Sequence, residues 1–503
     1  MKITKYIAIR NSIVLLILCM GFILGCTTPS PVVPEPTEIA TQTATSTPTE
    51  LPTVTQTPSP TPTPLPLNGQ QTRYSIDVTV NYYNRFITAS SHTLYTNKTN
   101  TPLNEIVFIV YPTIFQDAIY IKSIKLGDGI SVNNFRWDSH RMVIPLEQPL
   151  LPGEQIEFTH DFELYMPNRE GVFGQTGQQL NLSYWFPFIP PYDATNGWIA
   201  HDIQWVNSFF VGEFLVFEPA DFNINLQFTD RRENFKIAAS TLPQEENGKI
   251  HYESTLARTF TLSISDSFSV SEQEFNGIKI QSFAFTADAD VGEVVANVAK
   301  EALSLYSEMF GDYDRDVLSI VEFNADIGME FDGLIFLSFA FYNLYPGNPQ
   351  SNIHVYTAHE IEHQWFFSQV GNDQALEPWL DEAFATYSES LFYERFYPEY
   401  LIWWWENYIT SHDPSGDIDI SIYFGGDLFD YRNIVYRNGA LFLRDLRGII
   451  GDDAFFAFLK GYVAYYRYQI VTSKDFWTFL SQYTDADLSL LQNEYFENSP
   501  SLP

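Results

Sequence analysis

The segment HEIEH (359–363) contains residues whose types and spacing are suited to metal chemistry. His359 and His363 are four residues apart in a stretch of helical character, so both imidazoles project from one face, about one turn apart. That separation suits two nitrogen ligands on one Zn²⁺. Glu360 follows the first histidine, where its carboxylate can reach water at the metal rather than the metal itself. The segment therefore predicts a zinc site with an adjacent general base.

A third protein ligand is required, because two imidazoles leave a zinc ion under-coordinated. Glu382 is the candidate, in a second helical segment that begins after Pro378, a residue type favoured at helix starts. Glu389 lies seven residues further on, two turns along the same face. A carboxylate there can accept the second N–H of a ligand imidazole and fix its tautomer. A solvated helix face is the alternative explanation for Glu389.

The whole pattern resembles the zinc aminopeptidases typified by aminopeptidase N, which are gluzincin metallopeptidases. HExxH is followed by 18 residues and then by Glu382, within WLDEAFATY (379–387). The usual strings of that family read HExxHxW and WLNEGFAxY; Trp365 matches the first, whereas Asp381 and Ala383 differ from the second. Thermolysin-like endopeptidases share the looser HExxH…E plan, so this part alone does not choose between the two groups.

Two further segments favour the aminopeptidases. Gly328-Met329-Glu330 resembles the start of the exopeptidase strand that lies along the substrate in that family, and the resemblance implies that Glu330 holds the free α-amino group of a peptide. Pairing with an ammonium is what a buried carboxylate gains most from. Phe331 replaces the usual Asn, which bears on substrate preference.

The second segment, VYRNGA (435–440), is similar to the family's YxKGA. The resemblance places the phenol of Tyr436 opposite the metal, where its O–H would donate to a developing oxyanion. The implied function is a zinc-dependent aminopeptidase with one Zn²⁺, acting on peptides with a free N-terminus. The alternatives are a zinc endopeptidase or other zinc hydrolase on the same scaffold, and a catalytically lapsed envelope lipoprotein that binds peptides.

The first 25 residues have the order of a secretory signal, a basic head followed by a short apolar run over 13–24. The run ends in ILGC (23–26), which resembles the bacterial lipobox and implies that Cys26 is cleaved free and acylated. We expect the protein to be anchored by lipid to a membrane on the exported face of the cell envelope. An ordinary signal peptide or an uncleaved anchor is the alternative.

The rest of the chain divides into three parts. Residues 26–69 are dominated by Pro and Thr and predict an extended linker. Short runs with period-two alternation, such as that beginning at Tyr74, predict a β domain of sandwich type over 70–274. Helical periodicity then takes over, beginning with an amphipathic segment over 291–310. The predicted class is α+β, with a thermolysin-like, mostly helical metallopeptidase domain over 275–503.

Charge and cysteine content exclude other classes of protein. The chain holds 27 Lys plus Arg against 62 Asp plus Glu, a formal net charge of −35. A field of that sign repels a phosphate backbone, so we expect no nucleic-acid partner. Two cysteines allow one bridge at most, which rules out a fold held together by disulfides.

Overall fold

The computed structural model describes residues 70–206, 209–246 and 248–498. All of them belong to one compact unit. The predicted signal segment, Cys26 and the Pro/Thr-rich linker lie outside the described residues. In the parts that the structure describes, no helix is long and apolar enough to cross a membrane.

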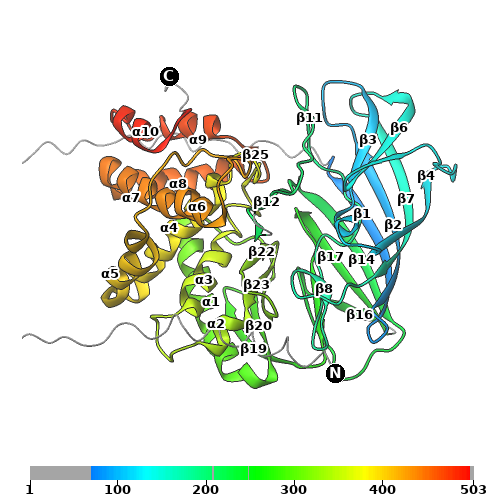
Figure 1. Ribbon diagram of the computed structural model, residues 1–503, viewed down its shortest axis with the longest axis horizontal. Helices are drawn as coiled ribbons and strands as arrows, with labels where there is room; N and C mark the ends of the chain where they lie inside the picture. The colour runs from blue at the N-terminus through cyan, green and yellow to red at the C-terminus, as the bar shows by residue number, and fades with distance from the viewer. Residues whose placement is uncertain (1–69, 207–208, 247, 499–503) are drawn as a thin grey trace, which may run out of the picture. The chain divides into compact units, whose positions relative to one another are not determined.

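The N-terminal region is built on a seven-stranded sheet of order β16-β17-β14-β1-β2-β7-β4. In its central strand, Tyr74, Ile76 and Val78 are buried while the residues between them are exposed, which is the alternation that the sequence predicts. Figure 1 shows this sheet in blue to green. Its strands are β1 (Thr72–Asn81), β2 (Phe86–Thr96), β4 (Ile119–Leu126), β7 (Gln155–Tyr165), β14 (Ala220–Phe228), β16 (Gln244–Glu246) and β17 (Lys249–Ala257).

Two smaller sheets pack on this large sheet. One buried cluster joins β3 and β6 to β7, where Phe108 meets Phe158 edge-on at 5.3 Å between ring centroids. The main core joins β1 and β14 to β9 and β18. The strands of the two sheets are β3 (Leu103–Ile109), β5 (Arg136–Asp138) and β6 (Arg141–Leu150), and β8 (Phe173–Gln175), β9 (Leu180–Leu182), β15 (Lys236–Ala239) and β18 (Leu262–Ser265).

A five-stranded sheet of order β19-β20-β21-β23-β22 underlies the helices, the first of which lies between β20 and β21 in the chain. Its strands are β19 (Phe268–Phe275), β20 (Ile278–Phe285), β21 (Val317–Phe323), β22 (Met329–Phe331) and β23 (Leu334–Ser338). Every residue of β21 is buried, as expected for a strand covered on both faces. The β19–β20 hairpin spans the predicted domain boundary at 274/275, which stays a prediction.

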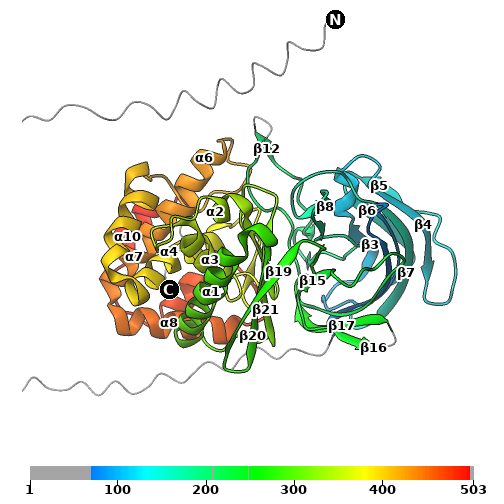
Figure 2. The same cartoon turned by 90° about the horizontal axis from the view of Figure 1, so that it is seen from below.

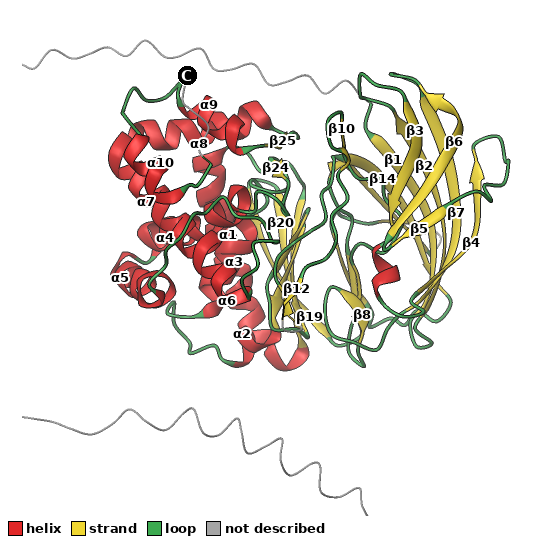
Figure 3. Cartoon of the chain, turned by 45° about the horizontal axis from the view of Figure 1, so that its top comes forward, coloured by secondary structure: helices red, strands yellow, loops and turns green. Residues whose placement is uncertain are grey.

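Helices dominate from residue 289 onward, so the predicted α+β class is confirmed (Figure 3). The first of them packs along β19 and β20 (Figure 2) and ends at Gly311, whose φ of 112° is a conformation that favours glycine. The helices are α1 (Ala289–Phe310), α2 (Phe339–Asn343), α3 (Asn352–Glu362), α4 (Trp379–Phe396), α5 (Leu401–Trp404), α6 (Leu428–Tyr431), α7 (Gly439–Ile450), α8 (Asp452–Tyr466), α9 (Ser473–Leu480) and α10 (Ser489–Tyr495).

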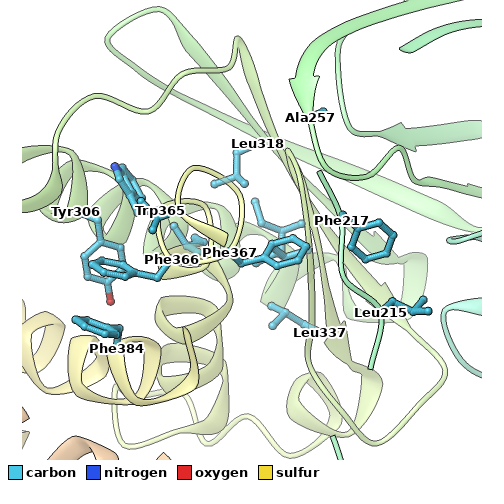
Figure 4. Packing of buried hydrophobic residues seen from close by; sticks show 14 of the residues in the cluster. Leu215, Phe217, Ala257, Tyr306, Leu318, Leu337, Trp365, Phe366, Phe367 and Phe384 are labelled. Atoms are coloured by element: carbon cyan, nitrogen blue, oxygen red, sulfur yellow. The ribbon is translucent and has the colours of Figure 1, made fainter. Parts of the chain in front are cut away.

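Aromatic side chains fix the relative positions of α1, α3 and α4. Phe366, just after α3, stacks on Phe384 of α4 with centroids 4.2 Å apart. Tyr306 of α1 meets Trp365 edge-on at 5.9 Å, and both rings are fully buried (Figure 4). Close-packed aromatic contacts of this kind leave little room for movement. The two helices that position the predicted metal ligands are therefore held in one arrangement.

A buried polar network joins the N-terminal strands to the helical part. The guanidinium of Arg258, which follows β17, donates to the carbonyl oxygens of Phe217 (2.7 Å), Ser368 (3.0 Å) and Gln469 (2.8 Å). The backbone N–H of Arg258 donates to the carboxylate of Asp332 at 3.0 Å. Arg258 thus binds chain segments that lie more than a hundred residues apart in the sequence.

Asp332 is the acceptor at the centre of this network. Its carboxylate is fully buried, and it accepts from Arg315 Nη2 and from the Ser368 hydroxyl, each at 2.6 Å. It also accepts from the backbone N–H of Thr259 at 2.8 Å. Because Asp332 directly follows β22, the network fixes the edge strand that contains Glu330.

We expect Asp332→Ala to lower the free energy of unfolding by about 3–5 kcal/mol, because it removes the nearer carboxylate of the buried Arg315 guanidinium and leaves it with Asp314 at 3.9 Å. Urea denaturation followed by tryptophan fluorescence measures the loss. Arg395→Ala is the matched control, since its ion pair with Glu308 is exposed and its removal is expected to cost about 0.5 kcal/mol or less. Equal losses in the two variants would show that the Asp332 network carries no special stability.

Candidate functional site

The three predicted metal ligands come together in one buried cluster. His359 lies in the last turn of α3, His363 directly follows that helix, and Glu382 lies in the first turn of α4 after Pro378. Glu382 Oε2 is 3.3 Å from His359 Nε2 and 3.6 Å from His363 Nε2. One ligand atom from each residue lies within 4.8 Å of the other two.

This donor set fits a divalent cation. Two nitrogens and one carboxylate oxygen are typical ligands of zinc in a site that leaves one position open. Among the described residues, the buried oxygens Glu382 Oε2 and Glu360 Oε2 accept no hydrogen bond. A buried carboxylate oxygen without a donor is costly, and a bound cation would remove that cost.

The titration of the carboxylates reflects burial and the two imidazoles. Burial raises the pKa of Glu360 to about 8, with the nearby histidines acting in the opposite direction. Burial also opposes ionisation of Glu382, but the adjacent imidazoles of His359 and His363 outweigh it and hold the pKa of Glu382 well below its ordinary range. Glu382 is therefore the anionic member of the cluster.

Both ligand imidazoles are oriented through Nδ1. His359 Nδ1 lies 2.8 Å from Glu389 Oε1, and the second oxygen of Glu389 accepts from Trp404 Nε1 at 2.8 Å. His363 Nδ1 lies 3.1 Å from the carbonyl oxygen of Phe366. Acceptors at both Nδ1 atoms favour the tautomer that leaves each Nε2 lone pair free for a metal. Glu389 therefore lies where the sequence places it, and it is not on a solvated helix face.

Tyr436 also reaches this cluster. It lies in a π-helical turn over Arg432–Asn438, a distortion common at functional sites. Its hydroxyl donates to Glu382 Oε1 at 2.5 Å, and its ring stacks on His359 with centroids 6.0 Å apart. Burial, followed by the charge of Glu382, raises the pKa of Tyr436 well above its ordinary value, so the phenol keeps its proton.

The predicted substrate strand forms one wall of the site. Glu330 lies at the centre of edge strand β22, and its carboxylate oxygen accepts from Gln374 Nε2 at 3.1 Å. Gly328 lies so close to Glu360 that a Cβ at this position would overlap the Glu360 carboxylate, so a larger residue would have to displace that carboxylate. Met329 lines the cavity beside them.

Phe331, which stands where the family has Asn, does not line the cavity. Its ring is fully buried and packs against Tyr184 and Phe336 at centroid distances of 5.2 and 5.8 Å. The departure from the family pattern is therefore a core packing contact in this chain.

The cavity over the cluster measures about 340 Å³. Five glutamates line it, and sequence analysis identified four of them: Glu330, Glu360, Glu382 and Glu389. The fifth, Glu213, belongs to the loop that follows β13 (Phe209–Phe210) in the N-terminal region. Burial and the neighbouring carboxylates Glu330 and Glu382 raise the pKa of Glu213. No motif surrounds Glu213, so only its loop's position in the fold identifies it.

We expect Glu389→Gln to weaken zinc binding about 10- to 100-fold, because the amide is a weaker acceptor for the His359 Nδ1 proton. Competition with a chromogenic chelator measures the affinity. Glu399→Gln, an exposed change just beyond the same helix, is the control and should leave the affinity unchanged. Equal zinc affinity in Glu389→Gln and the wild type would remove Glu389 from the metal site.

Comparison with known proteins agrees with this geometry. Residues 295–495 match the Peptidase family M1 domain. Aminopeptidase M1-D of Oryza sativa subsp. japonica is 27% identical over 225 residues, which is 41% of this chain and 25% of that protein. Aminopeptidase N of Lactobacillus helveticus is 26% identical over 312 residues, 56% of this chain and 36% of that protein. The chain thus spans about a quarter to a third of the length of these relatives.

Solved structures share the fold. A mutant M1 zinc metallopeptidase from Deinococcus radiodurans, bound to a Tyr-Ser-Ala substrate, superposes with a TM-score of 0.58 at 19% identity, covering 86% of this chain and 96% of that one. A two-domain M1 zinc metallopeptidase mutant bound to L-arginine gives 0.58 at 18% identity, with the same coverage. The chain therefore resembles the peptidase family M1 domain in sequence over residues 295–495, and it shares its fold with two-domain M1 zinc metallopeptidases.

Proposed function

We propose that this protein is a zinc-dependent aminopeptidase that removes residues from the N-terminus of peptides. The observation that carries the proposal is the position of Glu330. Its carboxylate lies within 4.8 Å of ligand atoms of Glu360 and His363, in the cavity that also contains the metal cluster. A substrate ammonium held at Glu330 would place the first peptide bond beside the metal ligands.

The relatives support the same activity. The matching proteins from rice and Lactobacillus are named aminopeptidases, and the Deinococcus neighbour is described with a bound tripeptide. The cavity of about 340 Å³ has room for part of a three-residue peptide. Glu213 would lie beside the same ammonium, so that two carboxylates face one cation.

The metal would be held by His359, His363 and Glu382. Bound there, Zn²⁺ supplies Lewis acidity, which polarises a peptide carbonyl and lowers the pKa of water toward about 7. The chain's own groups perform the proton transfers. Glu360 accepts the proton of the attacking water and returns it to the leaving amine. The Tyr436 hydroxyl, kept protonated by burial, donates to the oxyanion that forms at the carbonyl.

We expect the purified protein to contain zinc and to hydrolyse aminoacyl-arylamides, and Glu360→Gln to retain the zinc while losing at least about 10²-fold in kcat. Zinc is measured by atomic absorption and turnover by release of the arylamine. A Glu360→Gln enzyme with bound zinc and wild-type turnover would reject the assigned base.

A free tripeptide and its N-acetylated form separate the alternatives. Loss of the ammonium should abolish cleavage, because Glu330 then faces no positive charge. Cleavage of both peptides would indicate an endopeptidase. Bound zinc and peptide binding without any cleavage would indicate a lapsed enzyme that captures peptides.

We also propose that the protein is attached to a membrane through acylated Cys26. The support is the basic and apolar order of residues 1–25 and the cysteine that ends it. Cys26→Ser is expected to move the protein from the membrane to the soluble fraction, because acyl chains anchor through their buried methylenes. Cys19→Ser, within the apolar run, is the control, and the anchor proposal fails if Cys26→Ser stays with the membrane.

A further inference from the structure

A second, open cavity adjoins the catalytic one. It measures about 480 Å³ and is lined by residues of α2, α3 and the segment after α5. Tyr356, Tyr408 and Arg437 line both cavities. The Tyr408 hydroxyl donates to Asn352 Oδ1 at 2.6 Å, which holds this shared wall together. A bound molecule that extends past His359, His363 and Glu382 on this side would contact these three residues.

The two cavities follow one another along helix α3. Glu330 lies next to His363, at the C-terminal end of the helix. His359 follows one turn back, and Tyr356 is its neighbour, with ring centroids 6.3 Å apart. Asn352, at the first position of α3, lines the second cavity. Eleven residues of helix separate the two ends, a rise of about 16 Å.

The two cavities differ in charge, because acidic side chains outnumber Arg432 and Arg437 in the catalytic cavity and are absent from the described lining of the second. Five glutamates line the catalytic cavity, whereas none of the described residues that line the second cavity is Asp or Glu. Its basic residues are Arg437 and His412, and the remainder are amides, hydroxyls and apolar groups. The chain has a net charge of −35, so a cavity without acidic residues beside an acid-rich one is notable. A substrate that occupied both would meet negative charge at one end and positive charge at the other.

Arg437 is held in place, and its guanidinium keeps N–H donors for a further hydrogen bond. Its Nε donates to the carbonyl oxygen of Tyr408 at 3.0 Å, and its guanidinium lies 5.9 Å from the Phe429 ring centroid. Nη1 has no hydrogen-bond partner within the part of the chain that the structure describes. A guanidinium offers five N–H donors in a planar fork that matches a carboxylate.

We infer that Arg437 binds the C-terminal carboxylate of a short peptide whose ammonium is held at Glu330. This inference rests on the proposed aminopeptidase function and names its substrate class. Tyr356, which lines both cavities together with Arg437, lies seven residues before His363, a rise of about 10 Å along α3; at about 3.4 Å per extended residue this corresponds to peptides of about three residues or slightly more with a free C-terminus. Arg437 is thus a specificity-determining residue at the leaving-group end of the site.

The test compares tripeptides to pentapeptides as free acids and as C-terminal amides. We expect the wild type to prefer the acid by about 10-fold or more in kcat/KM, mainly through KM, because a charge-assisted hydrogen bond to the carboxylate is lost in the amide. Arg437→Gln should bring the acid-to-amide ratio close to 1. Arg437→Lys, which keeps the charge, should retain part of the preference.

Two further measurements complete the design. Arg444→Gln is the matched control, since Arg444 is a half-exposed arginine of α7 that stacks on Trp405, and it should keep the wild-type ratio. In the Glu360→Gln protein, calorimetry should give tighter binding of the acid than of the amide, independent of turnover.

The outcomes separate the two proposals. A wild-type ratio near 1, or an undiminished ratio in Arg437→Gln, overturns the role of Arg437. If Arg437→Gln does not fold, the wild-type ratio and Arg437→Lys still decide. Absence of aminoacyl-arylamide hydrolysis by the zinc-loaded wild type counts against the aminopeptidase function instead, because that substrate has no C-terminal carboxylate.

Discussion

Buried negative charge is the constraint on which this structure depends. Glu213, Glu330, Glu360, Glu382 and Glu389 face one cavity. Burial and mutual repulsion oppose the ionisation of all five unless positive charge joins them. Two imidazoles supply part of it, and a divalent ion with a substrate ammonium would supply the rest. The composition of the cavity therefore favours cationic ligands.

Holding these carboxylates together requires rigid neighbours on every side. The stacked rings of Phe366 and Phe384 fix α3 against α4, so that Glu382 reaches both histidines. Trp404 orients Glu389 from α5. Asp332 ties the edge strand of Glu330 to the N-terminal region. Each contact is buried, and each acts through geometry rather than through chemistry at the reacting atoms.

The sequence predicted the parts of the site that lie in local patterns. Helix periodicity accounts for the four-residue spacing of the histidines and for the seven-residue spacing from Glu382 to Glu389. Both can therefore be recognised without knowledge of the fold. Glu213 has no such pattern, because a loop of the N-terminal region brings it to the site; Arg437 lies within VYRNGA (435–440), but only the cavities of the fold single it out. The resemblance placed Phe331 near the substrate, but alternation along β22 turns its ring into the core, and only the pairing of that strand reveals this.

Asp332 stands two residues after Glu330, and its partners come from both halves of the described chain. Glu330, the residue proposed to bind the peptide N-terminus, is therefore attached to the Asp332 network that joins the two halves of the described chain. The metal ligands come from α3, from the residue that follows it and from α4, whereas Glu330 lies on strand β22 and Glu213 on a loop of the N-terminal region. The metal site and the proposed substrate register therefore depend on different parts of the fold, and the register depends on contacts with the N-terminal strands.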